Sequence, residues 1–162
     1  MNHVKHTFDI IIDNNSKILI LGSIPSIKSR EKNFYYMNPN NRFYKVLEAI
    51  FDDDFTNEDI NTKIELLKKH HIALYDVISE CDIINSSDQS IKNPVVAKID
   101  EIVLKYKIDR IFLNGKKAYS LFIKYFPHLI DKAILLPSTS SANAAYSLDK
   151  LISEWKIINQ YL

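Results

Sequence analysis

Four short apolar runs, each followed at once by a polar, turn-forming segment, constrain the fold of this chain more than any other feature. The runs are KILIL at 17–21, IALYDV at 72–77, RIFL at 110–113 and AILL at 133–136. Short apolar runs bounded by turn residues are typical of fully buried strands. Such strands occur mainly in parallel sheets that helices cover on both faces.

Helical patterns separate these apolar runs. Apolar residues recur at helical spacing in 41–51, 95–106, 118–125 and 148–158, and more weakly in 59–71. Ser147 is a good N-cap for the last of these helices. Residues 78–94 have no convincing period and are predicted to form a long functional loop, whereas residues 3–12 fit either a helix or an edge strand.

The alternation of strands and helices predicts an α/β fold. We expect a single domain over residues 1–162, built as a three-layer α/β/α sandwich with a central, mostly parallel four-stranded sheet. No segment approaches the roughly 20 apolar residues that a membrane span needs. The start of the chain lacks the pattern of a secretory signal, so a cytoplasmic location is expected, with a monomer as the default.

Charge and cysteine content narrow the possible functions. The chain has 21 basic and 20 acidic residues and a formal net charge of +1, so any contact with nucleic acid must be local. Cys81 is the only cysteine, which excludes an internal disulfide and a metal site built from thiolates alone. Its expected role is that of a small apolar core residue.

Ligands of open parallel sheets bind beyond the carboxyl ends of the strands, which directs attention to the loops that follow the four runs. These loops contain no paired carboxylates, no histidine and no phosphate-binding glycine motif, so neither a metal nor a cofactor is predicted. They contain instead neutral hydrogen-bonding side chains: Asn38, Asn40, Asn41, Ser86, Ser87, Ser138, Thr139, Ser140, Ser141 and Asn143. Tyr35 and Tyr36 lie beside them in the sequence. Amides with aromatic rings suit a planar heterocycle, although turn capping and core packing explain the same residues.

Three ordered motifs resemble a known family. The segment 22–26 (GSIPS), the segment 35–44 (YYMNPNNRFY) and the segment 136–144 (LPSTSSANA) are similar to the uracil-DNA glycosylase superfamily, and most of all to its DNA-deoxyinosine (hypoxanthine-DNA) glycosylases. The runs 72–77 and 111–115, with the pair Ser87-Asp88 between them, follow in the same order. The resemblance thus extends from Lys17 to Trp155.

The resemblance implies an enzyme that hydrolyses the bond between a deaminated base and its deoxyribose in DNA. The target nucleotide leaves the base stack, the sugar becomes oxocarbenium-like and the departing base gains negative charge. Hypoxanthine is the expected base, with xanthine or uracil as further candidates, in double-stranded or single-stranded DNA. No lysine lies within the motifs as an amine nucleophile, so the enzyme is expected to be monofunctional and to leave an abasic site.

The resemblance also assigns roles to single residues. Asn41 is the expected catalytic residue, because its amide can hold a water molecule and stabilise developing charge. The residues expected to contact the base are Gly22, Ser23, Ile24, Tyr36, as a stacking ring, and Asn114. Those expected to contact DNA are Ser138, Ser140, Ala142, at a wedge, Asn143 and Lys116, at a helix start.

Several positions depart from the family pattern. Ile24 stands where the mismatch-specific glycosylases have asparagine. Asn38, Asn40, Tyr44 and Ser141 replace the usual histidine, arginine, tryptophan and proline. Three alternatives therefore remain open: a mismatch-type uracil-DNA glycosylase, an inactive module that binds DNA or nucleotides, and a hydrolase of free nucleosides.

Overall fold

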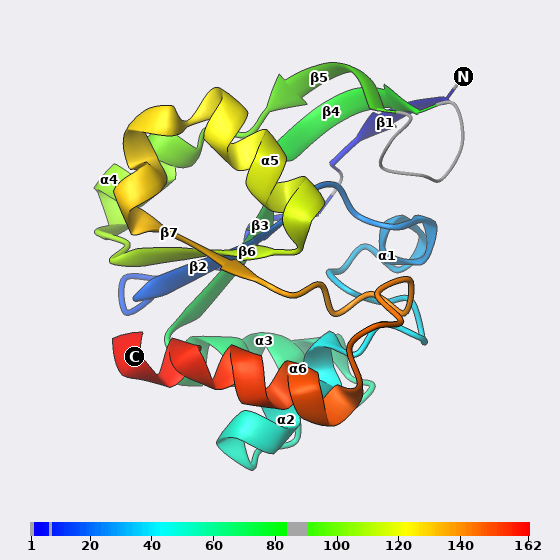
Figure 1. The fold of residues 1–162 in the computed structure, drawn as a ribbon, viewed down its shortest axis with the longest axis vertical. Helices are drawn as coiled ribbons and strands as arrows, with labels where there is room; N and C mark the ends of the chain where they lie inside the picture. Colours follow the sequence, from blue (N-terminus) through cyan, green and yellow to red (C-terminus); the bar gives the residue numbers. More distant parts are fainter. Residues whose placement is uncertain (1, 7, 84–90) are drawn as a thin grey trace.

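The computed structural model describes residues 2–6, 8–83 and 91–162, and its centre is a four-stranded parallel sheet in the order β3-β2-β6-β7 (Figure 1). The strands are β2 (Ile18–Gly22), β3 (Ile72–Asp76), β6 (Arg110–Asn114) and β7 (Ala133–Leu136). Each of the four apolar runs forms one of them, so the predicted sheet is confirmed. The order places β2 and β6 in the middle, where both edges of each strand are paired.

Helices cover both faces of this sheet (Figure 1). One layer contains α2 (Phe43–Phe51), α3 (Ile60–Lys69), α6 (Leu148–Trp155) and the 3₁₀ helix η3 (Lys156–Tyr161). The other contains α4 (Ile99–Tyr106), α5 (Lys116–Tyr125) and the 3₁₀ helix η2 (Pro127–Lys132). Because side chains alternate along a strand, Ile18 and Ile20 pack in the first layer's core while Leu19 and Leu21 pack in the other's. The three-layer sandwich is confirmed, and within the described ranges no helix has the length and apolar character to cross a membrane.

A second sheet corrects two details of the sequence analysis. The strands β1 (Asn2–Lys5), β4 (Ile78–Ile83) and β5 (Ile91–Val96) form an antiparallel sheet in the order β1-β4-β5. The prediction of a loop over 78–94 was therefore wrong for its two ends, and the open question at 3–12 is answered in part by an edge strand. The pairing of β4 with β5 shifts register twice, which breaks the alternation that would have revealed the strands.

Two further boundaries differ from the expected ones. Val95, assigned to a helical face, lies in β5 and is 51% exposed, and α4 begins only at Ile99. A short helix not expected from the sequence, α1 (Ile27–Lys32), follows β2. Its N-cap is Ser26, whose hydroxyl accepts a hydrogen bond from the Ser29 backbone N–H. The predicted site residues Ser86, Ser87 and Asp88 lie outside the described residues.

Candidate active site

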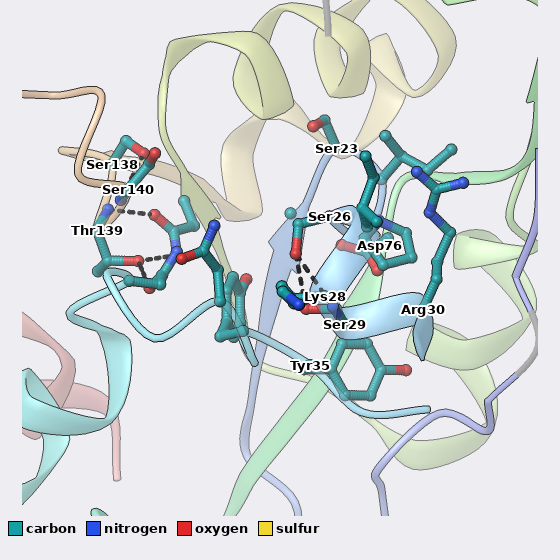
Figure 2. Close-up of a pocket in the computed structure, with 18 of the residues that line it drawn as sticks. Ser23, Ser26, Lys28, Ser29, Arg30, Tyr35, Asp76, Ser138, Thr139 and Ser140 are labelled. Carbon is teal, nitrogen blue, oxygen red and sulfur yellow. Dashed lines mark hydrogen bonds between the residues drawn. The ribbon is translucent and has the colours of Figure 1, made fainter. Parts of the chain in front are cut away.

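A cavity of about 550 Å³ lies at the carboxyl ends of the parallel strands, where the fold predicts a ligand site. Its walls come from the loop after β2, from α1, from the segment before α2, from the ends of β3 and β6, and from the loop after β7. Figure 2 shows two groups of polar side chains on opposite sides of it. Ser138, Thr139 and Ser140 form one group, and Ser23 and Asp76 belong to the other.

Most of the residues predicted from sequence line this cavity. They are Gly22, Ser23, Ile24, Tyr36, Asn41, Asn114, Ser138, Ser140 and Ala142. Two predicted DNA contacts are not among the lining residues. Lys116 is exposed at the start of α5, and the Asn143 side chain donates a hydrogen bond of 3.1 Å to the Ser138 carbonyl within its own loop.

The Asn41 amide is oriented by two donors. Its Oδ1 accepts hydrogen bonds from the Phe43 backbone N–H at 2.9 Å and from the Thr139 hydroxyl at 2.8 Å. A backbone N–H can only donate, so this geometry identifies the amide oxygen and leaves the NH₂ group for other contacts. Among the described residues that NH₂ group has no partner. Asn41 therefore offers the cavity a donor that can stabilise an anion or hold a water molecule by its oxygen.

Thr139 links Asn41 to Asn114 at the end of β6. It is fully buried, and its hydroxyl accepts a hydrogen bond of 3.0 Å from the Asn114 Nδ2 while donating to Asn41. Its backbone N–H donates to the Asn114 Oδ1, also at 3.0 Å. Sequence reasoning placed Thr139 among the polar loop residues without a role. The network shows that it fixes both amides.

Tyr36 forms an aromatic wall. Its ring stacks on Phe43 with centroids 4.2 Å apart and an interplanar angle of 29°. Its backbone is left-handed, with φ of 57°, which is uncommon for a residue with a side chain and turns the chain sharply before α2. Burial, with a smaller contribution from the charge of Asp76, raises the pKa of the Tyr36 phenol far above its usual range. The ring therefore stays neutral.

Asp76 is a pocket residue that the sequence analysis missed. It ends β3, is 3% exposed, and lines the cavity beside Gly22. A Cβ at position 22 would lie 2.5 Å from the Asp76 Oδ1 and 3.3 Å from the Tyr36 hydroxyl. Gly22 is thus required because a carboxylate occupies the space of its side chain, whereas the sequence suggested a close approach of the base. The available signal was an acidic residue at the end of an apolar strand.

Arg42 organises the loop between β7 and α6. Its guanidinium donates to the carbonyls of Thr139, Ser140, Asn143 and Tyr146, four positions without regular secondary structure. Its backbone N–H donates to the Thr139 carbonyl at 3.0 Å. Arg42 follows Asn41 directly, so the same short segment orients an amide in the cavity and holds the facing loop.

We expect Arg42→Gln to lower the free energy of unfolding by about 2 kcal/mol, because hydrogen bonds from a charged donor to partly buried carbonyls are lost. Amide hydrogen exchange across 138–146 should become faster. Arg110→Gln is the matched control, since the Arg110 guanidinium makes no contact with 138–146 among the described residues. It donates hydrogen bonds to its neighbour Asp109 and lies 5.1 Å from the centre of the Tyr161 ring. Unchanged exchange in the Arg42 variant would contradict this role.

Metal binding has no support in the side-chain arrangement. Across residues 2–6, 8–83 and 91–162, no group of three or more His, Cys, Asp or Glu side chains is placed to hold an ion.

Two basic side chains reach the cavity, since Lys28 and Arg30 of α1 line it (Figure 2). These two residues were not predicted from the sequence. The site thus combines donor amides, a neutral aromatic wall, one carboxylate and a basic rim.

Comparison with known proteins gives consistent matches. The model of the uracil DNA glycosylase superfamily matches residues 9–162. A Methanosarcina acetivorans protein named hypoxanthine DNA glycosylase is 31% identical over 160 residues, which cover 96% of this chain and 98% of that protein. A protein of the same name from Methanosarcina barkeri is 31% identical over 115 residues, 70% of this chain and 73% of its own length. The solution structure of a Methanosarcina acetivorans protein provisionally named uracil DNA glycosylase superposes with a TM-score of 0.79 at 31% identity, covering 93% of each chain.

These matches agree with the motifs in the loops of the cavity. The family match includes all three motifs, from GSIPS at 22–26 to LPSTSSANA at 136–144. The similar solution structure covers the same α/β architecture. The predicted resemblance is therefore confirmed in sequence and in fold, and the chain belongs to the uracil DNA glycosylase superfamily.

Proposed function

We propose that this DNA glycosylase removes hypoxanthine from deoxyinosine in DNA by hydrolysis and leaves an abasic site. The substrate is supported by the relatives named hypoxanthine DNA glycosylase, to one of which the chain is 31% identical over nearly its whole length. The observation that carries the chemistry is the Asn41 amide. Thr139 and the Phe43 N–H hold its oxygen, so the group that it offers the cavity is a donor.

The arrangement supports a mechanism without proton abstraction by Asn41. The base, rotated out of the duplex, lies against Tyr36, where stacking contributes about 1–3 kcal/mol. As the glycosidic bond lengthens, the sugar becomes oxocarbenium-like and the base accumulates negative charge. The Asn41 NH₂ group stabilises that charge or holds the attacking water by its oxygen. Water adds its oxygen to the sugar carbon as the bond to the base breaks. One of its protons is lost to solvent, and the departing base anion takes up a proton from solvent, so that neutral hypoxanthine and the abasic sugar are released.

We expect hydrolysis without strand cleavage. A lyase step needs a free amine to attack the sugar carbon. Lys28 is the lysine that lines the cavity, and its Nζ lies 3.3 Å from the Glu31 carboxylate in an ion pair. Its side chain is also half exposed, at 54%. The amine is thus engaged at the rim rather than held near a sugar, which favours a monofunctional enzyme.

The substrate of this enzyme class is DNA, and we propose that the enzyme acts on double-stranded or single-stranded DNA. Residues 138–140 and 142 and the basic residues Lys28 and Arg30 line the cavity, where they suit phosphates of a duplex or a single strand. The near-neutral net charge of +1 agrees with local contacts of this kind. A monomer and a cytoplasmic location stay predictions from the sequence.

The test is an incubation of the protein, in EDTA, with separate duplexes that carry one deoxyinosine, deoxyxanthosine or deoxyuridine. Strand breaks are scored with and without alkali. We expect breaks at deoxyinosine that require alkali. Cleavage at deoxyuridine alone would reassign the protein to uracil repair, and breaks without alkali would overturn the monofunctional reading. No cleavage at any base, with retained DNA binding, would support the inactive module, and release of base from free nucleosides would support the nucleoside hydrolase.

A further inference from the structure

A buried histidine and a buried carboxylate form a pair next to the cavity. The His6 Nε2 lies 2.9 Å from the Asp76 Oδ2, and the two side chains are 3% and 4% exposed. Aromatic rings surround the imidazole, with centroids at 4.4 Å for Phe8, 4.9 Å for Tyr75 and 5.7 Å for Tyr35. A polar pair in an aromatic enclosure needs accurate geometry, because leaving either partner unpaired is costly.

The hydrogen bonds of His6 fix the orientation of the carboxyl group. The His6 Nδ1 lies 2.9 Å from the Phe8 carbonyl oxygen, which can only accept, so Nδ1 carries a hydrogen. The Nε2 then faces the Asp76 Oδ2, so this oxygen is directed at the imidazole. The other oxygen, Oδ1, lies against Gly22 at the cavity wall.

The charge of Asp76 acts on this wall. Burial is the largest cause that raises the pKa values of the phenols of Tyr35, Tyr36 and Tyr75 above their usual range. The charge of Asp76 is the second largest cause for all three. These phenols stay neutral and can donate as well as accept a hydrogen bond, whereas a carboxylate oxygen at the wall only accepts. The glycosylase superfamily match begins at residue 9, so His6 comes from outside the matched segment.

We propose that His6 is a positioning residue that holds the Asp76 carboxylate at the cavity wall, where it accepts the ring N–H of a deaminated base. This rests on the proposed glycosylase function. Deamination of adenine places a hydrogen on ring nitrogen N1, which in adenine is a lone pair. A fixed carboxylate accepts from that N–H and repels the lone pair. A polar site of this kind discriminates strongly between hypoxanthine and adenine, because adenine offers no N1–H and leaves the buried carboxylate without its hydrogen bond.

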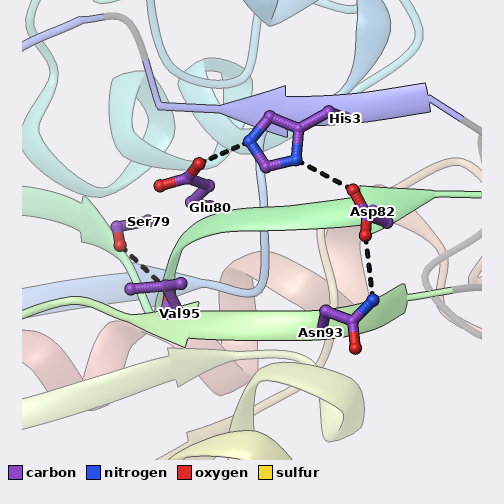
Figure 3. Close-up of polar contacts among 6 residues, drawn as sticks. All are labelled: His3, Ser79, Glu80, Asp82, Asn93 and Val95. Carbon is purple, nitrogen blue, oxygen red and sulfur yellow. Dashed lines mark hydrogen bonds and ion pairs between the residues drawn. The ribbon is translucent and has the colours of Figure 1, made fainter.

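The experiment compares four variants with the wild-type protein: His6→Leu, His6→Gln, Asp76→Asn and the double variant His6→Leu/Asp76→Asn. His6→Gln retains a donor near Nε2 and serves as the conservative rescue. His3→Leu is the matched control from the same N-terminal segment. His3 is exposed on β1 and contacts Glu80 and Asp82 on β4 of the antiparallel sheet (Figure 3). It is not among the residues that line the cavity. Thermal unfolding of every variant is recorded.

Two duplex substrates separate positioning from stability. One carries deoxyinosine, with N1–H, and the other deoxynebularine, whose N1 is a lone pair. We expect His6→Leu and Asp76→Asn to lower kcat/KM for deoxyinosine about 100-fold, with a smaller loss for deoxynebularine, so that the preference falls about tenfold. His6→Gln should regain most of the preference. The double variant should resemble Asp76→Asn, because His6 acts through that carboxylate.

Different results would contradict the role of His6, its action through Asp76, and the glycosylase function. If the wild-type protein cleaves deoxyinosine but the folded His6→Leu and Asp76→Asn variants keep the wild-type preference, the positioning role is contradicted while the proposed function stands. Additive losses in the double variant would show that His6 does not act through Asp76. An equal loss in His3→Leu would mean a general effect of the N-terminal segment. No wild-type cleavage of deoxyinosine would overturn the proposed function and this inference with it.

Discussion

Replacement of Asn41 by alanine is expected to lower the rate of base release about 100- to 1,000-fold, the usual loss when an oriented donor to developing charge is removed. The Asn41 oxygen is held by Thr139 and by the Phe43 N–H, so no other side chain can take over its NH₂ position without rearrangement. DNA affinity should stay within about threefold, since phosphate contacts dominate it. Single-turnover kinetics on a deoxyinosine duplex and fluorescence anisotropy measure the two quantities.

Asn40→Ala is the matched control for this prediction. Asn40 has the same side chain one position earlier, is exposed, and does not line the cavity. Its variant should cleave like the wild-type protein. If Asn41→Ala cleaved at the wild-type rate, the catalytic assignment would be wrong and the amide would be limited to its structural bonds before α2. A parallel loss of DNA affinity would instead indicate a role in binding.

Trp155→Ala is expected to lower the free energy of unfolding by about 3–5 kcal/mol, the range for a large aromatic residue removed from a core. Trp155 is fully buried and meets Phe43 edge to face, with centroids 5.8 Å apart and an interplanar angle of 80°. Its indole Nε1 donates a hydrogen bond of 2.9 Å to the Pro137 carbonyl. The substitution thus leaves a cavity between α6 and α2 and an unpaired carbonyl where the loop after β7 begins.

Urea unfolding followed by circular dichroism measures this loss, since Trp155 is the only tryptophan and its removal abolishes the tryptophan fluorescence. Leu104→Ala is the control, because Leu104 is 82% exposed on α4 and should change stability by less than about 0.5 kcal/mol. Trp155→Phe should lie between the two, since it retains much of the packing but loses the indole donor. A loss below that of Leu104→Ala would contradict the role of Trp155 as a core residue.

Local patterns explain how much of the molecule could be predicted from sequence. The runs at 17–21, 72–77 and 110–113 are largely buried on both faces, so each is a continuous apolar segment that can be identified from the sequence. The run at 133–136 is also continuously apolar, although it forms an edge strand in which Leu135 is 41% exposed. By contrast, β4 and β5 were missed because two register shifts and an exposed face break their alternation. The helix α1 was missed because it has only six residues, too few for a clear period.

The same distinction holds for the candidate site. Each motif is a continuous segment, and those around Gly22 and Thr139 directly follow strands, so the sequence by itself determined that these two would meet at one edge of the sheet. The motif around Asn41 lies between α1 and α2, on the same connection that leaves β2. Only the tertiary structure decided the contacts between distant residues. Thr139 orients Asn41 across 98 positions, and His6 meets Asp76 across 70. The physical reason is that a hydrogen bond depends on distance and angle in space. The packing of the two sheets and the helix layers sets that distance and angle, and a local sequence pattern does not contain them.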